Sequence, residues 1–140
     1  MSSFKVNVCV AQHIGDRQEQ QDRAAIITSP RNPGAMLAIV ADGMGGRTGG
    51  RLAADQVVST AENLFKDMTD RDSTYRDMLL HLAAEAHTVI RLTAISAEKE
   101  PHSTLCALII KKNYAIWANA GDSRLYFFRG GRLVHRSEDH

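Results

Sequence analysis

The sequence of 140 residues predicts a single α+β domain, in which antiparallel sheets carry a pair of helices on one face. Three observations lead to this fold class. Two consecutive amphipathic segments with helical periodicity lie in the middle of the chain. Strand-like segments precede and follow them, and the later ones are joined by hairpin turns. Strands and helices do not alternate, so a parallel sheet built from βαβ units is not expected.

Three strands are predicted before the helices. Residues 5–10 alternate valines with Lys, Asn and Cys, which is typical of a half-buried strand. A polar loop over residues 13–22 precedes a short strand over 24–28. A Pro- and Gly-containing turn over 30–34 then leads to the apolar run 36–41, whose length and β-branched content indicate a buried strand.

The two central segments are predicted to form an antiparallel helix pair. In the first, from about Leu52, the apolar face consists of Ala54, Val57, Val58, Ala61, Leu64 and Phe65. In the second, it consists of Met78, Leu79, Leu82, Ala83, Ala86, Val89 and Ile90. The polar segment 69–73 separates the two helices and offers an N-terminal cap to the second. We expect both faces to lie in the core rather than in a binding site.

Four strands are predicted after the helices, as two hairpins. These hairpins comprise residues 105–110 with 114–118, around the polar segment 111–113, and residues 125–128 with 133–135. Gly130 and Gly131 make the second hairpin the clearer one, because both central residues of a tight turn can then adopt positive φ.

Composition excludes several classes of function. A net charge of +1 gives no reason to expect a nucleic acid or an anionic membrane as partner. No apolar run approaches the roughly 20 residues of a membrane span, and the N-terminus lacks the apolar segment of a signal peptide. Cys9 and Cys106 are far apart and are expected to be small buried residues in a reducing compartment. We therefore expect a soluble cytoplasmic protein.

Three loops place an aspartate at the end or start of a predicted strand: Asp22, Asp42 and Asp122. If these strands are neighbours, the carboxylates converge, and one must take up a proton or a cation must bind between them. Ligand sets made only of oxygen favour Mg²⁺ or Mn²⁺. Arg17 precedes Asp22 by five residues, and a guanidinium beside cations suits a phosphate group. Taken singly, each residue also has an ordinary explanation as a turn former, a cap or a surface ion pair.

Four motifs, in this order along the chain, resemble those of the metal-dependent protein phosphatases of the protein phosphatase 2C family. They are Arg17-x-x-x-Gln21-Asp22, Val40-Ala41-Asp42-Gly43-Met44-Gly45-Gly46, Ser103-Thr104-Leu105 and Ala118-Asn119-Ala120-Gly121-Asp122-Ser123-Arg124. Glu138-Asp139-His140 resembles the element that follows the last hairpin there. One Asp-Gly pair would be weak evidence, but four motifs in one order are specific.

The resemblance implies an antiparallel β-sandwich with a helix pair outside each sheet, of which residues 1–140 would be the N-terminal part with one helix pair. It implies a protein serine/threonine phosphatase, in which two Mn²⁺ or Mg²⁺ ions, beside a third and looser metal position, activate a water molecule. The substrates would be proteins phosphorylated on Ser or Thr by a kinase.

The same resemblance assigns roles to individual residues. Arg17 matches the phosphate-binding arginine, and Asp42 matches the aspartate that bridges two metals; both would be catalytic. Gly43 matches the residue whose backbone carbonyl binds one metal. Asp22 matches an acid that holds metal-bound water, and Asp122 one linked to the third metal position.

The chain departs from the family pattern in three respects. Met44 occupies a place where some members carry a proton-donating His, and His102 stands where Gly is usual. The family domain also continues well beyond residue 140, so we expect the 140-residue chain to be weakly active. A truncated, non-catalytic module that binds phosphoproteins or another partner is the alternative. A nucleotide-binding loop is disfavoured, because Thr48 stands where the dinucleotide fingerprint needs Gly or Ala and no Gly-Lys-Ser/Thr occurs.

Overall fold

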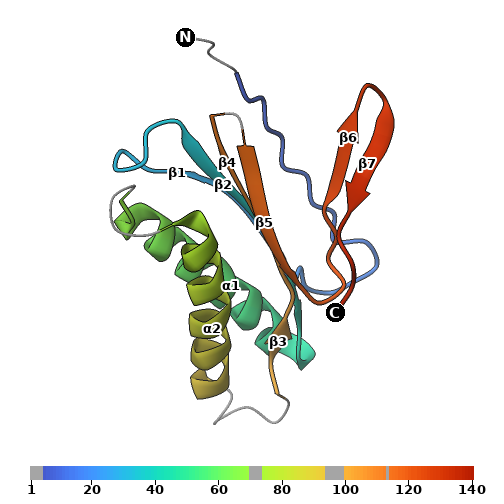
Figure 1. The fold of residues 1–140 in the computed structure, drawn as a ribbon. Coiled ribbons are helices and arrows are strands. Elements are labelled where there is room, and N and C mark those ends of the chain that lie inside the picture. Colours follow the sequence, from blue (N-terminus) through green and yellow to red (C-terminus); the bar gives the residue numbers. More distant parts are fainter. Residues whose placement is uncertain (1–4, 70–73, 94–99, 113) are drawn as a thin grey trace.

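The computed structural model describes residues 5–69, 74–93, 100–112 and 114–140. Its elements, in chain order, are β1 (Asp22–Thr28), β2 (Ala35–Met44), α1 (Gly46–Asp67), α2 (Tyr75–Thr93), β3 (His102–Ser103), β4 (Leu105–Lys111), β5 (Tyr114–Ala120), β6 (Tyr126–Arg129) and β7 (Arg132–Arg136). The main sheet has the antiparallel order β1-β2-β4-β5, with β3 paired to the end of β2. Strands β6 and β7 form a separate hairpin (Figure 1).

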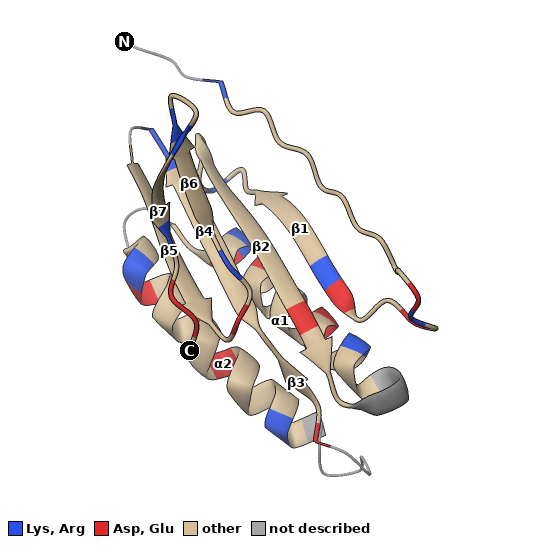
Figure 2. Ribbon diagram, turned by 90° about the vertical axis from the view of Figure 1, so that its right-hand side faces the viewer, with Lys and Arg blue, Asp and Glu red and all other residues tan. Residues whose placement is uncertain are grey.

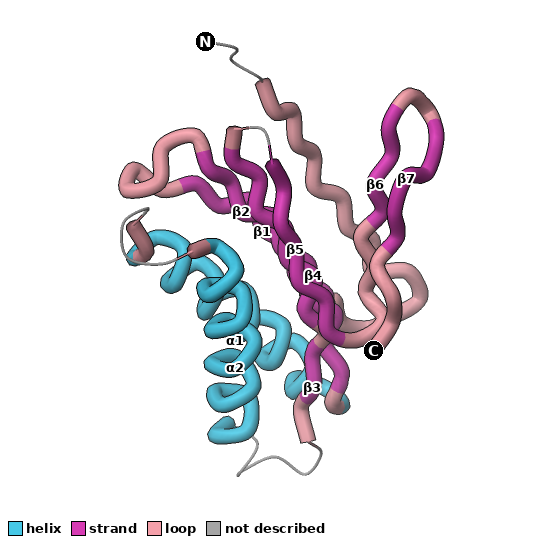
Figure 3. The backbone as a smooth tube through the Cα atoms, viewed as in Figure 1, coloured by secondary structure: helices cyan, strands magenta, loops and turns pink. Residues whose placement is uncertain are grey.

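Both helices cover one face of the main sheet, which confirms the predicted α+β class (Figure 3). Alternate residues of β2 point toward the helices because side chains alternate across a strand: Leu37, Ile39 and Ala41 are at most 2% exposed. They pack with the apolar faces of α1 and α2, including the fully buried Phe65 and Leu82. The predicted helix faces therefore lie in the core, except that Ala83 is exposed and Val89 is only partly buried. None of the helices in the described part of the chain has the length and apolar character to cross a membrane.

The opposite face of the main sheet remains partly open. Val40 and Trp117 lie on it with 46% and 38% of their surfaces exposed, and every residue of β6 and β7 is exposed. Residues 5–14 run along this face as an exposed coil, so the predicted strand over 5–10 was wrong (Figure 1). The valine alternation had a strand's period, but no described strand pairs with this segment. Cys9 is accordingly exposed, against expectation, whereas Cys106 is buried.

Element boundaries differ from prediction mainly at the glycine-rich segment. β2 continues to Met44 instead of ending at Ala41, and α1 begins at Gly46 instead of about Leu52. The glycines are needed for contact between these two elements: a Cβ built on Gly43 would lie 1.8 Å from the carbonyl oxygen of Gly50. The short β3 was not predicted. The predicted cap within segment 69–73 falls largely on 70–73, which lie outside the described residues, as does residue 113.

Candidate active site

Asp22 and Asp42 lie directly opposite each other, on neighbouring strands. The antiparallel register of β1 and β2 pairs Asp22 with Asp42, and Ala24 with Val40. Figure 2 shows the two acidic positions side by side at this end of the sheet. Both side chains lie on the face away from the helices, because Arg23 and Ala41, the next pair along, face the core side. The predicted convergence of these two acids is therefore observed.

The electrostatics of the pair show that negative charge is crowded there. Burial raises the pKa of Asp42 from its ordinary value of 3.8 to about 6, with further upward contributions from a hydrogen bond with Asp22 and from the charges of Asp22 and Asp122. The nearby guanidinium of Arg17 lowers this pKa, but only partly offsets the rise. The structure thus brings all four residues within electrostatic reach of one another.

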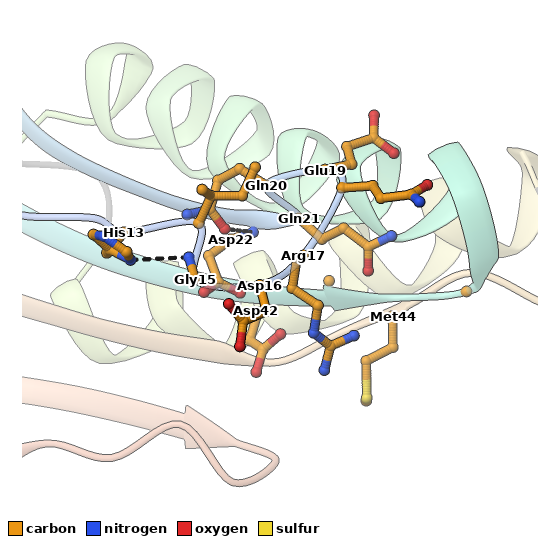
Figure 4. A pocket seen from close by; sticks show the side chains of 14 residues that line it. His13, Gly15, Asp16, Arg17, Glu19, Gln20, Gln21, Asp22, Asp42 and Met44 are labelled. Carbon is orange, nitrogen blue, oxygen red and sulfur yellow. Dashed lines mark hydrogen bonds between the residues drawn. The ribbon is translucent and has the colours of Figure 1, made fainter.

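Arg17 belongs to the loop that forms the wall of an open cleft of about 1350 Å³. Residues 13–22 line one side of this cleft, and Asp42 to Gly45 line the other. Figure 4 shows Arg17 beside Asp16 and Asp42, with Met44 beyond its guanidinium. Among the described residues, the Arg17 guanidinium forms no salt bridge. The cleft wall therefore carries a positive charge beside the Asp42 carboxylate.

The loop is attached to the rest of the fold through Arg23. The Arg23 side chain donates hydrogen bonds to the backbone carbonyls of Gln20 and Asp22, at 3.0 and 2.7 Å. Its Nε lies 2.6 Å from the Asp55 carboxylate on α1. A second link joins Glu19 to Arg51 at 3.3 Å. Helix α1 thus holds the segment that carries both Arg17 and Asp22.

The segment that carries Asp122 approaches the pair through Thr104. Gly121 has φ of 100°, and a Cβ there would lie 2.8 Å from Thr104 Cγ2, so only glycine fits. The same segment is fastened to the chain's last residues: Arg124 binds Asp139 through two hydrogen bonds of 2.9 and 2.8 Å, and this contact lowers the pKa of Asp139. The His140 amide also donates to the Gly121 carbonyl at 3.0 Å.

The donor set fits a hard divalent cation in part. Two opposed carboxylates, one with a raised pKa, form an oxygen-only site whose negative charge the Arg17 guanidinium offsets only in part, which suits Mg²⁺ or Mn²⁺. Within the described residues, however, no three His, Cys, Asp or Glu side chains come close enough to form a metal-binding group. Asp122 therefore influences the pair through its charge without joining it as a third close ligand.

Comparison with known proteins decides the family. A sequence model described as protein phosphatase 2C matches residues 10–140. The chain belongs to the protein phosphatase 2C family. Among its relatives, the serine/threonine phosphatase Stp of Listeria welshimeri is 30% identical over 129 residues, which cover 89% of this chain and 50% of that protein.

Solved structures of the family agree with the fold. A serine/threonine phosphatase of S. agalactiae superposes with a TM-score of 0.71 at 27% identity, covering 85% of this chain and 50% of that one. The catalytic domain of the phosphatase PstP, solved with two manganese ions, gives a TM-score of 0.68 at 27% identity, covering 84% and 48%. The chain thus spans about half the length of these relatives.

Three residues of the site had no assigned part in the sequence analysis. Asp16 lines the cleft, and Arg23 fixes its loop. Thr104 belonged to a recognised motif, but its contact with Asp42 depends on strand register, which the motif does not reveal. Only for Arg23 did the sequence offer a signal. Arg23 directly follows Asp22, and this places it on the core-facing side of β1.

Proposed function

We propose that this chain carries metal- and phosphate-binding residues of a protein serine/threonine phosphatase of the protein phosphatase 2C family. The observation that supports this most directly is the pair Asp22–Asp42 in register, with the Arg17 guanidinium close enough to affect the Asp42 pKa, at one end of an open cleft. A pocket that combines converging acids with an arginine suits phosphoryl transfer to water.

In this proposal, Asp42 and the Gly43 carbonyl would bind the cations directly. Asp22 holds their water ligands, and Asp122 serves a third, looser position. A pair of divalent cations, when bound, supplies Lewis acidity and lowers the pKa of a water molecule toward neutrality. The structure of PstP with two manganese ions supports Mn²⁺ or Mg²⁺ as the cofactor. The crowding of negative charge around Asp42 gives the chain its own reason to bind them.

Arg17 would bind the phosphate through two parallel hydrogen bonds and stabilise the charge on its oxygens during transfer. Met44, which is 53% exposed at the cleft, has no proton to donate to the leaving alkoxide. Because the cleft is open, we infer that solvent protonates the leaving group.

We further propose that residues 1–140 form the N-terminal part of one domain. The open face of the main sheet, with Val40 and Trp117 partly exposed, supports this. The substrates would be proteins phosphorylated on Ser or Thr, since the Listeria relative is named a serine/threonine phosphatase and the Streptococcus relative a protein phosphatase. We also propose that these substrates are cytoplasmic and are phosphorylated by a Ser/Thr kinase.

The test is hydrolysis of p-nitrophenyl phosphate and of a phosphothreonine peptide, with Mn²⁺, Mg²⁺ or chelator. The 140-residue chain and the complete product of its gene are assayed together. We expect metal-dependent turnover by the gene product, abolished by Asp42→Asn, and weak turnover by the 140-residue chain, because its described residues hold too few ligands. A gene product that binds Mn²⁺ and the peptide without hydrolysis would support the non-catalytic alternative.

A further inference from the structure

The Thr104 side chain occupies a place in the β-ladder that a backbone carbonyl normally fills. β2 pairs with β4 up to Val40–Cys106 and with β3 from Gly43–Ser103 in one unbroken register, which puts Thr104 opposite Asp42. A pair of this kind exchanges two backbone hydrogen bonds. Here the Thr104 amide donates to the Asp42 carbonyl at 2.9 Å, but the Asp42 amide donates to Thr104 Oγ1, also at 2.9 Å.

The local backbone explains why the Asp42 amide donates to a side-chain hydroxyl and not to the Thr104 carbonyl. Thr104 lies between β3 and β4 and belongs to neither strand. Its carbonyl accepts a hydrogen bond from the Ser103 hydroxyl at 2.9 Å instead of from Asp42. The Asp42 amide therefore depends on a side-chain hydroxyl, which a substitution can remove without deleting any backbone group.

The same hydroxyl joins Asp42 to the segment that carries Asp122. Thr104 Oγ1 lies 2.5 Å from Ser123 Oγ, and Thr104 as a whole is only 4% exposed. Gly121 packs against the Thr104 methyl group. The loop that carries Asp122 therefore contacts both the hydroxyl and the methyl group of Thr104. Thr104 thus lies between the strand that holds Asp42 and the loop that holds Asp122.

We propose that Thr104, with Ser123, is a positioning residue that fixes the Asp42 carboxylate relative to Asp122. The direction of a carboxylate is set by its backbone and two side-chain torsions, so loosening the Asp42 amide moves the ligand itself. A buried amide left without an acceptor is unfavourable, and the end of β2 would shift to satisfy it. Because it concerns metal ligands, the inference rests on the proposed function.

The test compares Thr104→Val, which keeps the shape and removes the hydroxyl, with Thr104→Ser, which keeps the hydroxyl. Thr60→Val, at a buried threonine of α1 that is 7% exposed and does not line the cleft, is the matched control. Two quantities are measured for the unmodified protein and for each variant. They are the hydrogen-exchange rate of the Asp42 amide without metal, and the Mn²⁺ affinity by calorimetry. Thermal unfolding without metal reports general destabilisation.

We expect Thr104→Val to speed exchange of the Asp42 amide by about tenfold or more. We expect it to weaken Mn²⁺ binding by about 10- to 100-fold, as outer contacts of metal ligands do. Thr104→Ser should keep both the exchange rate and the Mn²⁺ affinity close to those of the unmodified protein. Ser123→Ala should change both in the same direction as Thr104→Val, but less. Thr60→Val should change neither.

Unchanged exchange and Mn²⁺ affinity in Thr104→Val would overturn the inference, as would equal losses in Thr60→Val. If the unmodified protein binds no Mn²⁺, the proposed function fails. The exchange comparison then still decides whether Thr104 holds Asp42 in place.

Discussion

Asp42→Asn should make the metal-free protein more stable at neutral pH while it removes metal binding. In the folded chain, burial and the carboxylates of Asp22 and Asp122 raise the pKa of Asp42 from 3.8 to about 6. The folded state therefore binds this proton more tightly than the unfolded state. Between about pH 4 and pH 6 stability falls as pH rises, and above pH 6 the full penalty of the ionised carboxylate remains. Asparagine has the same shape and no charge, so it avoids this penalty.

The magnitude follows from the size of the shift. A rise of about two pKa units corresponds to at most about 3 kcal/mol. Asp42 is only partly buried, and solvent screens its neighbours, so we expect a gain of about 1 kcal/mol at pH 7.5. At pH 4, where the carboxyl is protonated in the folded state, the gain should vanish.

The assay is urea unfolding in chelator at pH 7.5 and pH 4, with Mn²⁺ calorimetry on the same samples. Asp77→Asn is the control, because it changes an exposed carboxylate in the first turn of α2, where a negative charge is favourable and no gain is expected. If Asp42→Asn is no more stable than the unmodified protein at pH 7.5, or gains equally at both pH values, crowding of charge at Asp42 is the wrong explanation. Unchanged Mn²⁺ affinity would remove Asp42 from the metal site.

Three further predictions concern the surroundings of this pair. Arg17→Ala should lower kcat/KM for a phosphopeptide with little change in Mn²⁺ affinity, and Arg17→Lys should not fully restore it, because an ammonium lacks the planar fork; full restoration would show that only charge matters. Gly43→Ala should destabilise the fold by about 3 kcal/mol or more in urea unfolding, because its Cβ would overlap the backbone of α1. Gly49→Ala, whose Cβ would make only an ordinary contact at 3.7 Å, should be neutral or stabilising by comparison. Arg23→Ala should lower the free energy of unfolding, measured in urea, by about 1–2 kcal/mol, because its hydrogen bonds to the Gln20 and Asp22 carbonyls are lost. A loss no greater than that of Asp55→Ala alone would show that these backbone contacts contribute nothing.

Much of the fold was predictable because its signals are local. The helix faces around Phe65 and Leu82 repeat with the helical period, and the run ending at Asp42 has the composition of a buried strand. The valine alternation over 5–10 failed because a strand also needs a partner edge, which the period does not reveal. The start of α1 at Gly46 was missed because glycine is a poor helix former. At Gly50, in the same segment, glycine is required, because a Cβ there would lie 2.8 Å from the backbone of Gly43 and Met44 in β2.

The site was predictable in part, for a related reason. Asp22 and Asp42 end up opposite each other because β1 and β2 form an antiparallel pair joined by one turn. Asp122 lies beyond β5, and its distance from the pair depends on β4 and on the path of the loop after Ala120. Sequence patterns give no measure of such a distance.

The motifs depend on one another through their glycines. Gly43 of one motif admits the backbone carbonyls of Gln21, from the first motif, and of Gly50, at the start of α1. Gly121 of another motif admits the Thr104 side chain from a third. Thr104 in turn holds the amide of Asp42. A side chain added at either glycine would therefore displace a residue of a different motif, and the displacement would reach Asp42 from two directions. Substitutions at these positions should not combine additively, since they share contacts, and the end of the sheet that carries Asp22 and Asp42 is best understood as one packed unit.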